Sequence, residues 1–191
     1  MAERGAPFPV CLWPDCKPAP DQRVFVLALA GSSSDRSEAR AAARLAARQA
    51  LAGQLAQPLD AVQLHALPGQ PPQVLGWPDI GLSFSHEAGL SLVAVNLDGP
   101  VGVDVVQATA PDDWQVVARD YLGPQALALG AAGFAPTWAA LEARLKCCGF
   151  DLDEWSAERE QRLLAACLAL PLALPCAADA WVAALALPRP V

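Results

Sequence analysis

The sequence is poor in positive charge. Its 191 residues include only two lysines, Lys17 and Lys146, and two histidines, His65 and His86. Lysine and arginine together number 13 against 20 aspartates and glutamates, which gives a net charge of -7. A chain with this balance has no broad electrostatic surface for nucleic acid. An anionic ligand must therefore be bound by a local cluster of basic side chains.

The sequence also lacks a long uninterrupted apolar segment, although 54% of it is hydrophobic. Pro171, Pro175 and Asp179 interrupt the apolar stretch 163–187, so we expect no membrane span. The apolar stretch 23–34 is short and follows a proline-rich segment, which favours a buried strand over a signal peptide. The length suits one domain, or two small and closely packed halves.

Cysteine is present but in no zinc-binding pattern. No Cys-x-x-Cys pair occurs, and no histidine stands at zinc-finger spacing. We expect reduced, buried or incidental thiols in a cytoplasmic protein, with a disulfide or a regulatory use as the alternative. The six cysteines are Cys11, Cys16, Cys147, Cys148, Cys167 and Cys176.

The first half of the chain predicts strands around one helix. The apolar run 24–30 is typical of a buried strand. The segment 32–55 offers a capping Ser or Asp and then arginines four residues apart among alanines, which predicts a helix. A short strand is expected at 63–67. The segment 82–106 predicts two or three strands, broken at HEAG and NLDG in the manner of hairpins.

The second half is mainly helical. Helices are expected at 112–121, from a capping Thr137 to about Gly149, and at 152–168, followed by a closing strand at 180–188. No repeat of fixed period is evident. The order of strands and helices predicts an α+β fold with helices packed on antiparallel sheet.

One carboxylate interrupts a strand-like run of valines. In PVGVDVVQ, residues 100–107, Asp104 is expected to be costly to bury unless it is paired, hydrogen-bonded or bound to a metal. Trp138, Glu142 and Lys146 lie four residues apart and so share one helix face. Taken alone, Glu142 and Lys146 form an ordinary stabilising pair. Together with Asp104 they make an oxygen site suited to Mg²⁺ and phosphate.

Two further groups could meet an anion. Ser85 and His86 end a strand before a turn and could donate hydrogen bonds to a phosphate, although a structural histidine is the simpler reading. Arginines at 36, 40, 44 and 48 follow one side of the expected helix. They form either a solvated face or a clamp for a terminal phosphate.

Three blocks in this order, FSHEAGLSLVAV, VGVD and WAALEARLKCCG, resemble the signature of the 4′-phosphopantetheinyl transferases of the surfactin-synthetase-activator type. That family has a Ser-His block, a Gly-[Val/Ile]-Asp strand and a Trp-x-x-x-Glu-Ala-x-x-Lys helix. The match covers about residues 40–149, and the closing strand is similar too. Three ordered blocks are far more specific than any one of them.

The resemblance implies transfer of the 4′-phosphopantetheine arm of coenzyme A to a serine of an acyl, peptidyl or aryl carrier protein, with release of 3′,5′-ADP. It implies one transferase unit over 1–191, with two similar halves, about 1–98 and 99–191, related by a pseudo-twofold axis. Coenzyme A and Mg²⁺ would bind between the halves. A monomer is expected, with the carrier docking beside 114–134 through apolar contacts.

The resemblance also implies roles for individual residues. Asp104 and Glu142 would hold Mg²⁺, and Glu142 would also help to deprotonate the carrier serine. Lys146 would neutralise the pyrophosphate as its bond breaks. Coenzyme A phosphates would be bound by Ser85, His86 and Arg40, with Arg36 or Arg44 as helpers.

The chain departs from the family pattern at three positions. Val106 stands where many members have a second acid, so water or a neighbouring side chain must replace that metal ligand. Leu141 and Gln70 replace basic residues, and the stretch between Asp104 and Trp138 is short. Two alternatives therefore stay open: a non-catalytic homologue that binds a carrier or coenzyme A, and an unrelated α+β protein.

Overall fold

The structure, a computed structural model, describes residues 6–33, 35–66, 70–176 and 179–190. Within these ranges the chain forms five α-helices and three sheets, and most strand pairs are antiparallel. The predicted mixed α+β fold is confirmed at this level. None of the described helices combines the length and the apolarity needed to cross a membrane.

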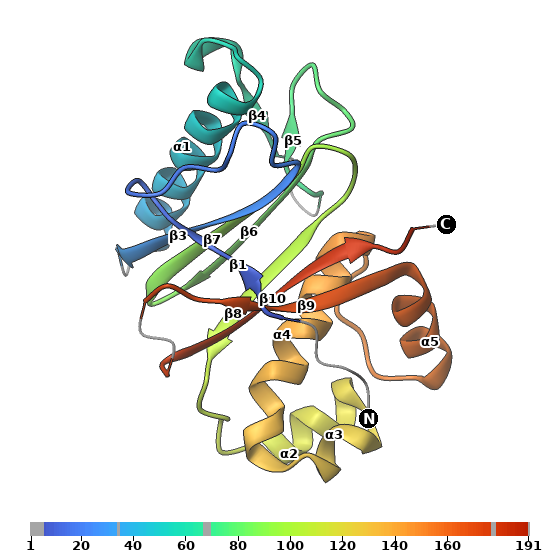
Figure 1. Cartoon of the computed structure of the whole chain (residues 1–191). Helices are drawn as coiled ribbons and strands as arrows, with labels where there is room; N and C mark the ends of the chain where they lie inside the picture. The colour runs from blue at the N-terminus through green and yellow to red at the C-terminus, as the bar shows by residue number, and fades with distance from the viewer. Residues whose placement is uncertain (1–5, 34, 67–69, 177–178, 191) are drawn as a thin grey trace.

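The first large sheet carries one long helix on its outer face. Its order is β2 (Cys11–Leu12), β3 (Val24–Ser32), β7 (Gly89–Asn96) and β6 (Gly81–Glu87). The helix α1 (Arg36–Gln54) lies along this sheet at one end of the molecule (Figure 1). The strand predicted at 24–30 and the hairpin predicted at HEAG are confirmed. The hairpin predicted at NLDG is wrong, because the strand that follows it, residues 102–107, pairs in the second large sheet and not with β7.

The sequence explains why α1 forms and which way it faces. The side chain of Asp35 caps it by accepting hydrogen bonds from the backbone N–H groups of Ser37 and Glu38. The residues that α1 buries against the sheet are small, which brings the helix close to the strands. They include Ala39, Ala43, Ala46, Ala47 and Ala50, followed by Leu51.

The second large sheet is built from later segments of the chain, with one exception. Its order is β1 (Phe8–Pro9), β9 (Cys167–Ala173), β10 (Trp181–Pro188) and β8 (Gly102–Gln107). The helix α4 (Gly130–Cys148) packs across β8 and β10, and its buried alanines contact both strands. Because β1 comes from the start of the chain and pairs with β9, it ties the expected halves 1–98 and 99–191 together.

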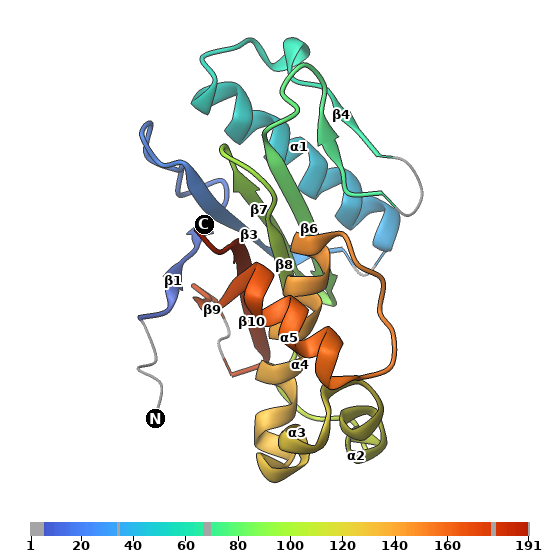
Figure 2. The same ribbon diagram turned by 90° about the vertical axis from the view of Figure 1, so that its right-hand side faces the viewer.

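The smaller elements lie at the ends of the molecule. A two-stranded sheet is formed by β4 (Leu64–His65) and β5 (Gln73–Val74), and a short 3₁₀ turn spans Leu59–Ala61. The predicted strand 63–67 is thus present at β4, and residue 67 lies outside the described ranges. Beneath α4 lie α2 (Trp114–Val117), a π-helical turn at Ala118–Leu122 and α3 (Pro124–Ala128), as both views show (Figures 1 and 2).

A core of alternating side chains fills the space between the two large sheets. On β3, Phe25 and Leu27 point toward α1, while Val26 and Ala28 point toward the second sheet. On β8, Val103 and Val105 meet the same inter-sheet core. The intervening residues of β8 consequently face α4.

The predicted start of α4 is wrong, whereas its predicted end is right. The helix expected to begin at Thr137 begins at Gly130, and Thr137 Oγ1 donates to the carbonyl oxygen of Gly133 instead of capping. Packing of Phe134 against Trp114 and Trp138 stabilises the turns before Pro136. The predicted end of this helix at Gly149 is confirmed, since Gly149 has φ +66°.

The helix predicted at 152–168 is shorter and a strand follows it. Ser156 caps α5 (Ala157–Ala166), and residues 167 and 168 already belong to β9. Pairing with β10 makes this segment extended. The closing strand predicted at 180–188 is confirmed as β10.

The expectation of reduced cysteines is wrong for one pair. Cys11 and Cys16 are joined by a disulfide across a turn, with their Cα atoms 5.2 Å apart, within the ordinary range for such a bond. The remaining cysteines are free thiols: Cys147, Cys148, Cys167 and Cys176.

Candidate functional site

The residues singled out from the sequence gather around one pocket of about 470 Å³. Four elements contribute to it: the start of α1, the end of β6, the middle of β8 and one face of α4. All six predicted site residues line it, namely Arg40, Ser85, His86, Asp104, Glu142 and Lys146. The volume falls in the usual range for small-molecule and cofactor sites.

Gly102 allows α4 to lie against β8. A Cβ at this position would come within 1.8 Å of the carbonyl oxygen of Ala143 on α4. Asp104 follows Gly102 by two residues and therefore faces α4 as well. This close approach is what brings Glu142 and Lys146 of the helix to the strand carboxylate.

Asp104 is the buried centre of the pocket, with only 3% of its surface exposed. Its Oδ1 accepts hydrogen bonds from Lys146 Nζ at 2.6 Å and from Ser85 Oγ at 2.8 Å. Its Oδ2 is buried and has no hydrogen-bond partner among the described residues. A buried carboxylate oxygen without a partner is costly, and a bound cation would satisfy it.

Ser85 positions Asp104. Its hydroxyl donates to Asp104 and accepts from the backbone N–H of Val105 at 3.1 Å. Ser83 accepts from Val103 N–H at 3.0 Å in the same way, so two serines attach β6 to β8. The hydroxyl of Ser85 is thus engaged within the protein, and its expected contact with a phosphate stays a prediction.

Lys146 links the strand to the helix. Besides its bond to Asp104, its Nζ donates to the carbonyl oxygen of Val103 at 3.2 Å and lies 3.9 Å from Glu142 Oε2. A third of its side chain is exposed, so the ammonium group can also meet a ligand. Burial raises the pKa of Glu142, the charge of Asp104 raises it further, and Lys146 lowers it.

His86 is neutral near pH 7. Burial lowers its pKa, and the positive charges of Arg40, Lys146 and Arg36 lower it further. Its Nδ1 lies 2.9 Å from Ser91 Oγ, which fixes the ring orientation. A neutral imidazole in this position can donate a hydrogen bond, but it adds no positive charge to the pocket.

The arginine row on α1 is divided between two roles. Arg36 and Arg40 line the pocket, whereas Arg44 is exposed outside it. Arg48 is structural, because its guanidinium donates to the carbonyl oxygens of Val62 and Leu59 at 2.7 and 3.0 Å. Arg44 therefore fits the solvated face and Arg48 fits neither alternative, while a phosphate clamp stays a prediction for Arg36 and Arg40.

The predicted metal site has two converging carboxylates, Asp104 and Glu142. In the described part of the chain, no three side chains of His, Cys, Asp or Glu already converge as metal ligands. The unpartnered Oδ2 of Asp104 nevertheless fits a divalent cation, which would complete its shell with water and ligand oxygens.

Sequence reasoning missed Glu87, which also lines the pocket. The signal was available, since Glu87 follows Ser85 by two residues on a strand and shares its face.

Two of the positions at which the chain departs from the family pattern also line pockets. Val106 lines this pocket, and Gln70 lines a neighbouring one that shares Lys146. In the segment expected to dock a carrier, Val116, Leu127 and Leu129 are exposed.

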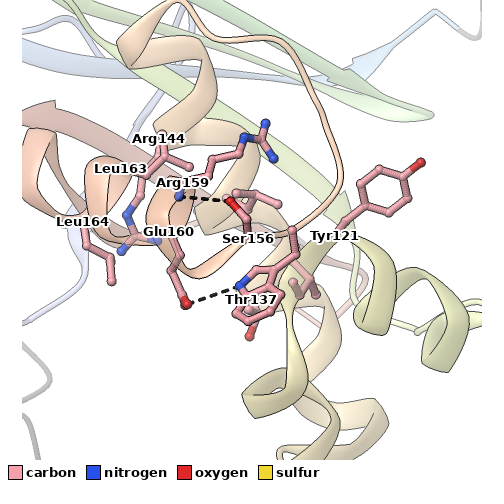
Figure 3. Close-up of a pocket in the computed structure, with 11 residues that line it drawn as sticks. Tyr121, Thr137, Arg144, Ser156, Arg159, Glu160, Leu163 and Leu164 are labelled. Carbon is pink, nitrogen blue, oxygen red and sulfur yellow. Dashed lines mark hydrogen bonds between the residues drawn. The ribbon is translucent and has the colours of Figure 1, made fainter.

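A separate cavity of about 70 Å³ lies on another face of α4, against α5 and the π-helical turn (Figure 3). There Trp155 Nε1 donates to Glu160, and the backbone N–H of Arg159 donates to Ser156, both at 3.2 Å. Burial lowers the pKa of Arg144, whose Nε has no partner among the described residues. None of the predicted site residues lines this cavity.

No model of a protein family matches the sequence, and a search of curated proteins finds no match either. The likeness to phosphopantetheinyl transferases therefore rests on the three sequence blocks and on the residues that the fold brings together.

Proposed function

We propose that the chain is a 4′-phosphopantetheinyl transferase that moves the phosphopantetheine arm of coenzyme A to a serine of an apo carrier protein. The observation that carries the proposal is the convergence of Arg40, His86, Asp104, Glu142 and Lys146 on one pocket. These residues belong to four elements and were chosen from the sequence for one reaction. An unrelated fold would have no reason to gather them.

The arrangement of elements supports the same proposal. Each four-stranded sheet has one long helix on its outer face, α1 on the first and α4 on the second. This agrees with two similar halves about a pseudo-twofold axis. The pocket takes Arg40 and His86 from the first half and Asp104, Glu142 and Lys146 from the second.

Asp104 and Glu142 are the residues that would hold Mg²⁺, which would supply charge neutralisation to the pyrophosphate when bound. In the reaction, the carrier serine Oγ attacks the phosphorus that bears pantetheine. The bond from that phosphorus to the bridging oxygen breaks, and 3′,5′-ADP leaves. The serine proton passes to Glu142, which acts as the general base.

The basic residues bind and orient the anionic substrate. Lys146 already contacts Asp104 and has exposed surface left to meet the leaving phosphate. Arg40 and Arg36 line the same pocket from α1, where a guanidinium fork can bind a terminal phosphate. The exposed apolar residues near α2 and α3 are a docking surface for the carrier.

The test is intact mass spectrometry of apo carrier proteins after incubation with the protein, coenzyme A and Mg²⁺. We expect a mass gain of one phosphopantetheine arm, abolished by chelation, by Glu142→Gln and by Lys146→Ala. Arg40→Ala should raise KM for coenzyme A about tenfold or more, because a hydrogen bond to a charged group is lost.

Arg44→Ala is the matched control, since Arg44 lies one turn along the same helix outside the pocket. It should leave KM unchanged. Binding of coenzyme A without transfer to any carrier would refute the enzyme and favour the non-catalytic homologue.

A further inference from the structure

Three acidic side chains line the pocket, and one of them has no role so far. Glu87 ends β6, is partly exposed, and makes no ion pair with any described residue. Asp104 and Glu142, in contrast, both interact with Lys146. Glu87 therefore presents a free carboxylate at the rim of a pocket with a buried, unpartnered carboxylate oxygen at its centre.

The contacts of Ser83 and Ser85 with β8 indicate that Glu87 lies near Val106 and Gln107, at the end of that strand. The backbone N–H groups of Val103 and Val105 donate to the hydroxyls of Ser83 and Ser85. Alternate residues of β6 therefore lie beside alternate residues of β8. The next step along β6 is Glu87, on the same face as both serines. The next pocket-facing residue of β8 after Asp104 is Val106, which also lines the pocket.

A cation held by Asp104 and Glu142 would have coordination positions left for another oxygen ligand. Mg²⁺ takes six oxygen ligands in octahedral geometry, and Asp104 and Glu142 supply only two carboxylates. Asp104, which is almost wholly buried, lines this pocket, and its Oδ2 has no hydrogen-bond partner among the described residues. Among the residues lining the pocket, Glu87 is the remaining carboxylate.

We propose that Glu87 is the third protein carboxylate of the divalent cation site, so that the chain takes from β6 the acid that β8 lacks at Val106. No three acids converge among the described residues without a cation. Binding therefore includes a side-chain rotation of Glu87, which a partly exposed glutamate makes readily. The proposal rests on the proposed function, because it concerns the same site.

The test measures binding of Mn²⁺ alone and with coenzyme A, by electron paramagnetic resonance of the free ion. Glu87→Gln should raise the Kd for Mn²⁺ about tenfold or more, as the loss of a ligand does. Adding Val106→Glu to that variant should restore the Kd to within about threefold, because the acid then stands on the neighbouring strand. Glu158→Gln, an exposed change on α5, is the matched control and should have no effect.

The outcomes separate this inference from the proposed function. If Glu87→Gln binds Mn²⁺ as the unchanged protein does while Asp104→Asn loses it, Glu87 is not a ligand and the transferase proposal stands. If the unchanged protein binds no Mn²⁺ even with coenzyme A, the cation site itself is refuted, and both proposals fall with it. Thermal unfolding of each variant verifies that it is folded.

Discussion

The pocket depends on a position without a side chain, Gly102, and this can be tested directly. In Gly102→Ala the new Cβ would lie 1.8 Å from the carbonyl oxygen of Ala143 and 2.7 Å from the backbone nitrogen of Cys147. Both are backbone atoms of α4, so no side-chain rotation relieves the overlap. Ordinary contact begins at 3.4 Å, so α4 must move away from β8 by roughly 1.5 Å.

The cost should fall at the upper end of the range for overpacking, about 3 kcal/mol. For a chain of this size that lowers Tm by roughly 6–12 °C. The assay is urea and thermal unfolding followed by tryptophan fluorescence. The same movement draws Glu142 on α4 away from Asp104, so the folded variant should also bind Mn²⁺ more weakly.

Gly53→Ala is the matched control for this change. Gly53 lies inside α1, and a Cβ there would meet nothing within 4 Å. Alanine favours the helix, so this variant should be more stable by about 0.5–1 kcal/mol. A free energy of unfolding for Gly102→Ala within about 0.5 kcal/mol of the unchanged protein would refute the argument that α4 rests on the bare backbone of β8.

Two further predictions concern buried groups. Ser85→Ala removes a hydrogen bond to a buried carboxylate and leaves a buried N–H without its acceptor, so it should lower the free energy of unfolding by about 1–3 kcal/mol in urea titrations. Ser37→Ala, in an exposed position, should cost much less. Burial and a hydrogen bond with the Cys167 thiol raise the pKa of Cys148 to about 12. Iodoacetamide at pH 8 should therefore label Cys148 only after unfolding. The free energy of unfolding that this raised pKa contributes should be fully present below the ordinary thiol pKa of about 8.5 and should be lost as pH rises from there to about 12.

The sequence predicted which residues gather around one pocket better than it predicted the limits of the helices. Asp104 among valines could be interpreted because alternation along a strand sends neighbours to opposite faces, and Val103 and Val105 do meet the inter-sheet core. The start of α4 could not be found in this way. A proline inside a helix usually marks a boundary, and only the packing of Phe134 against distant aromatic residues keeps the earlier turns helical.

Contacts between segments far apart in the sequence explain the other features that sequence reasoning missed. The strand β9 has no clear alternating pattern and contains Pro171, and its extended form depends on pairing with β10. Which residues of β6 face the pocket also depends on contacts with a distant segment of the chain. The sequence placed His86 and Ser85 at a strand end, but that Glu87 lines the same pocket as Val106 depends on the contacts of Ser83 and Ser85 with β8.

The charges of the pocket explain how an acidic protein could bind a polyanion. Three basic side chains (Arg36, Arg40 and Lys146) and three acidic ones (Glu87, Asp104 and Glu142) line it. These charges nearly cancel, and the neutral His86 adds none, so the pocket alone attracts phosphate weakly. In the proposed function, a divalent cation held by the acids would reverse this, because it would neutralise carboxylates that otherwise repel the ligand. On that proposal, the acids of the pocket would make binding of a pyrophosphate dependent on a metal.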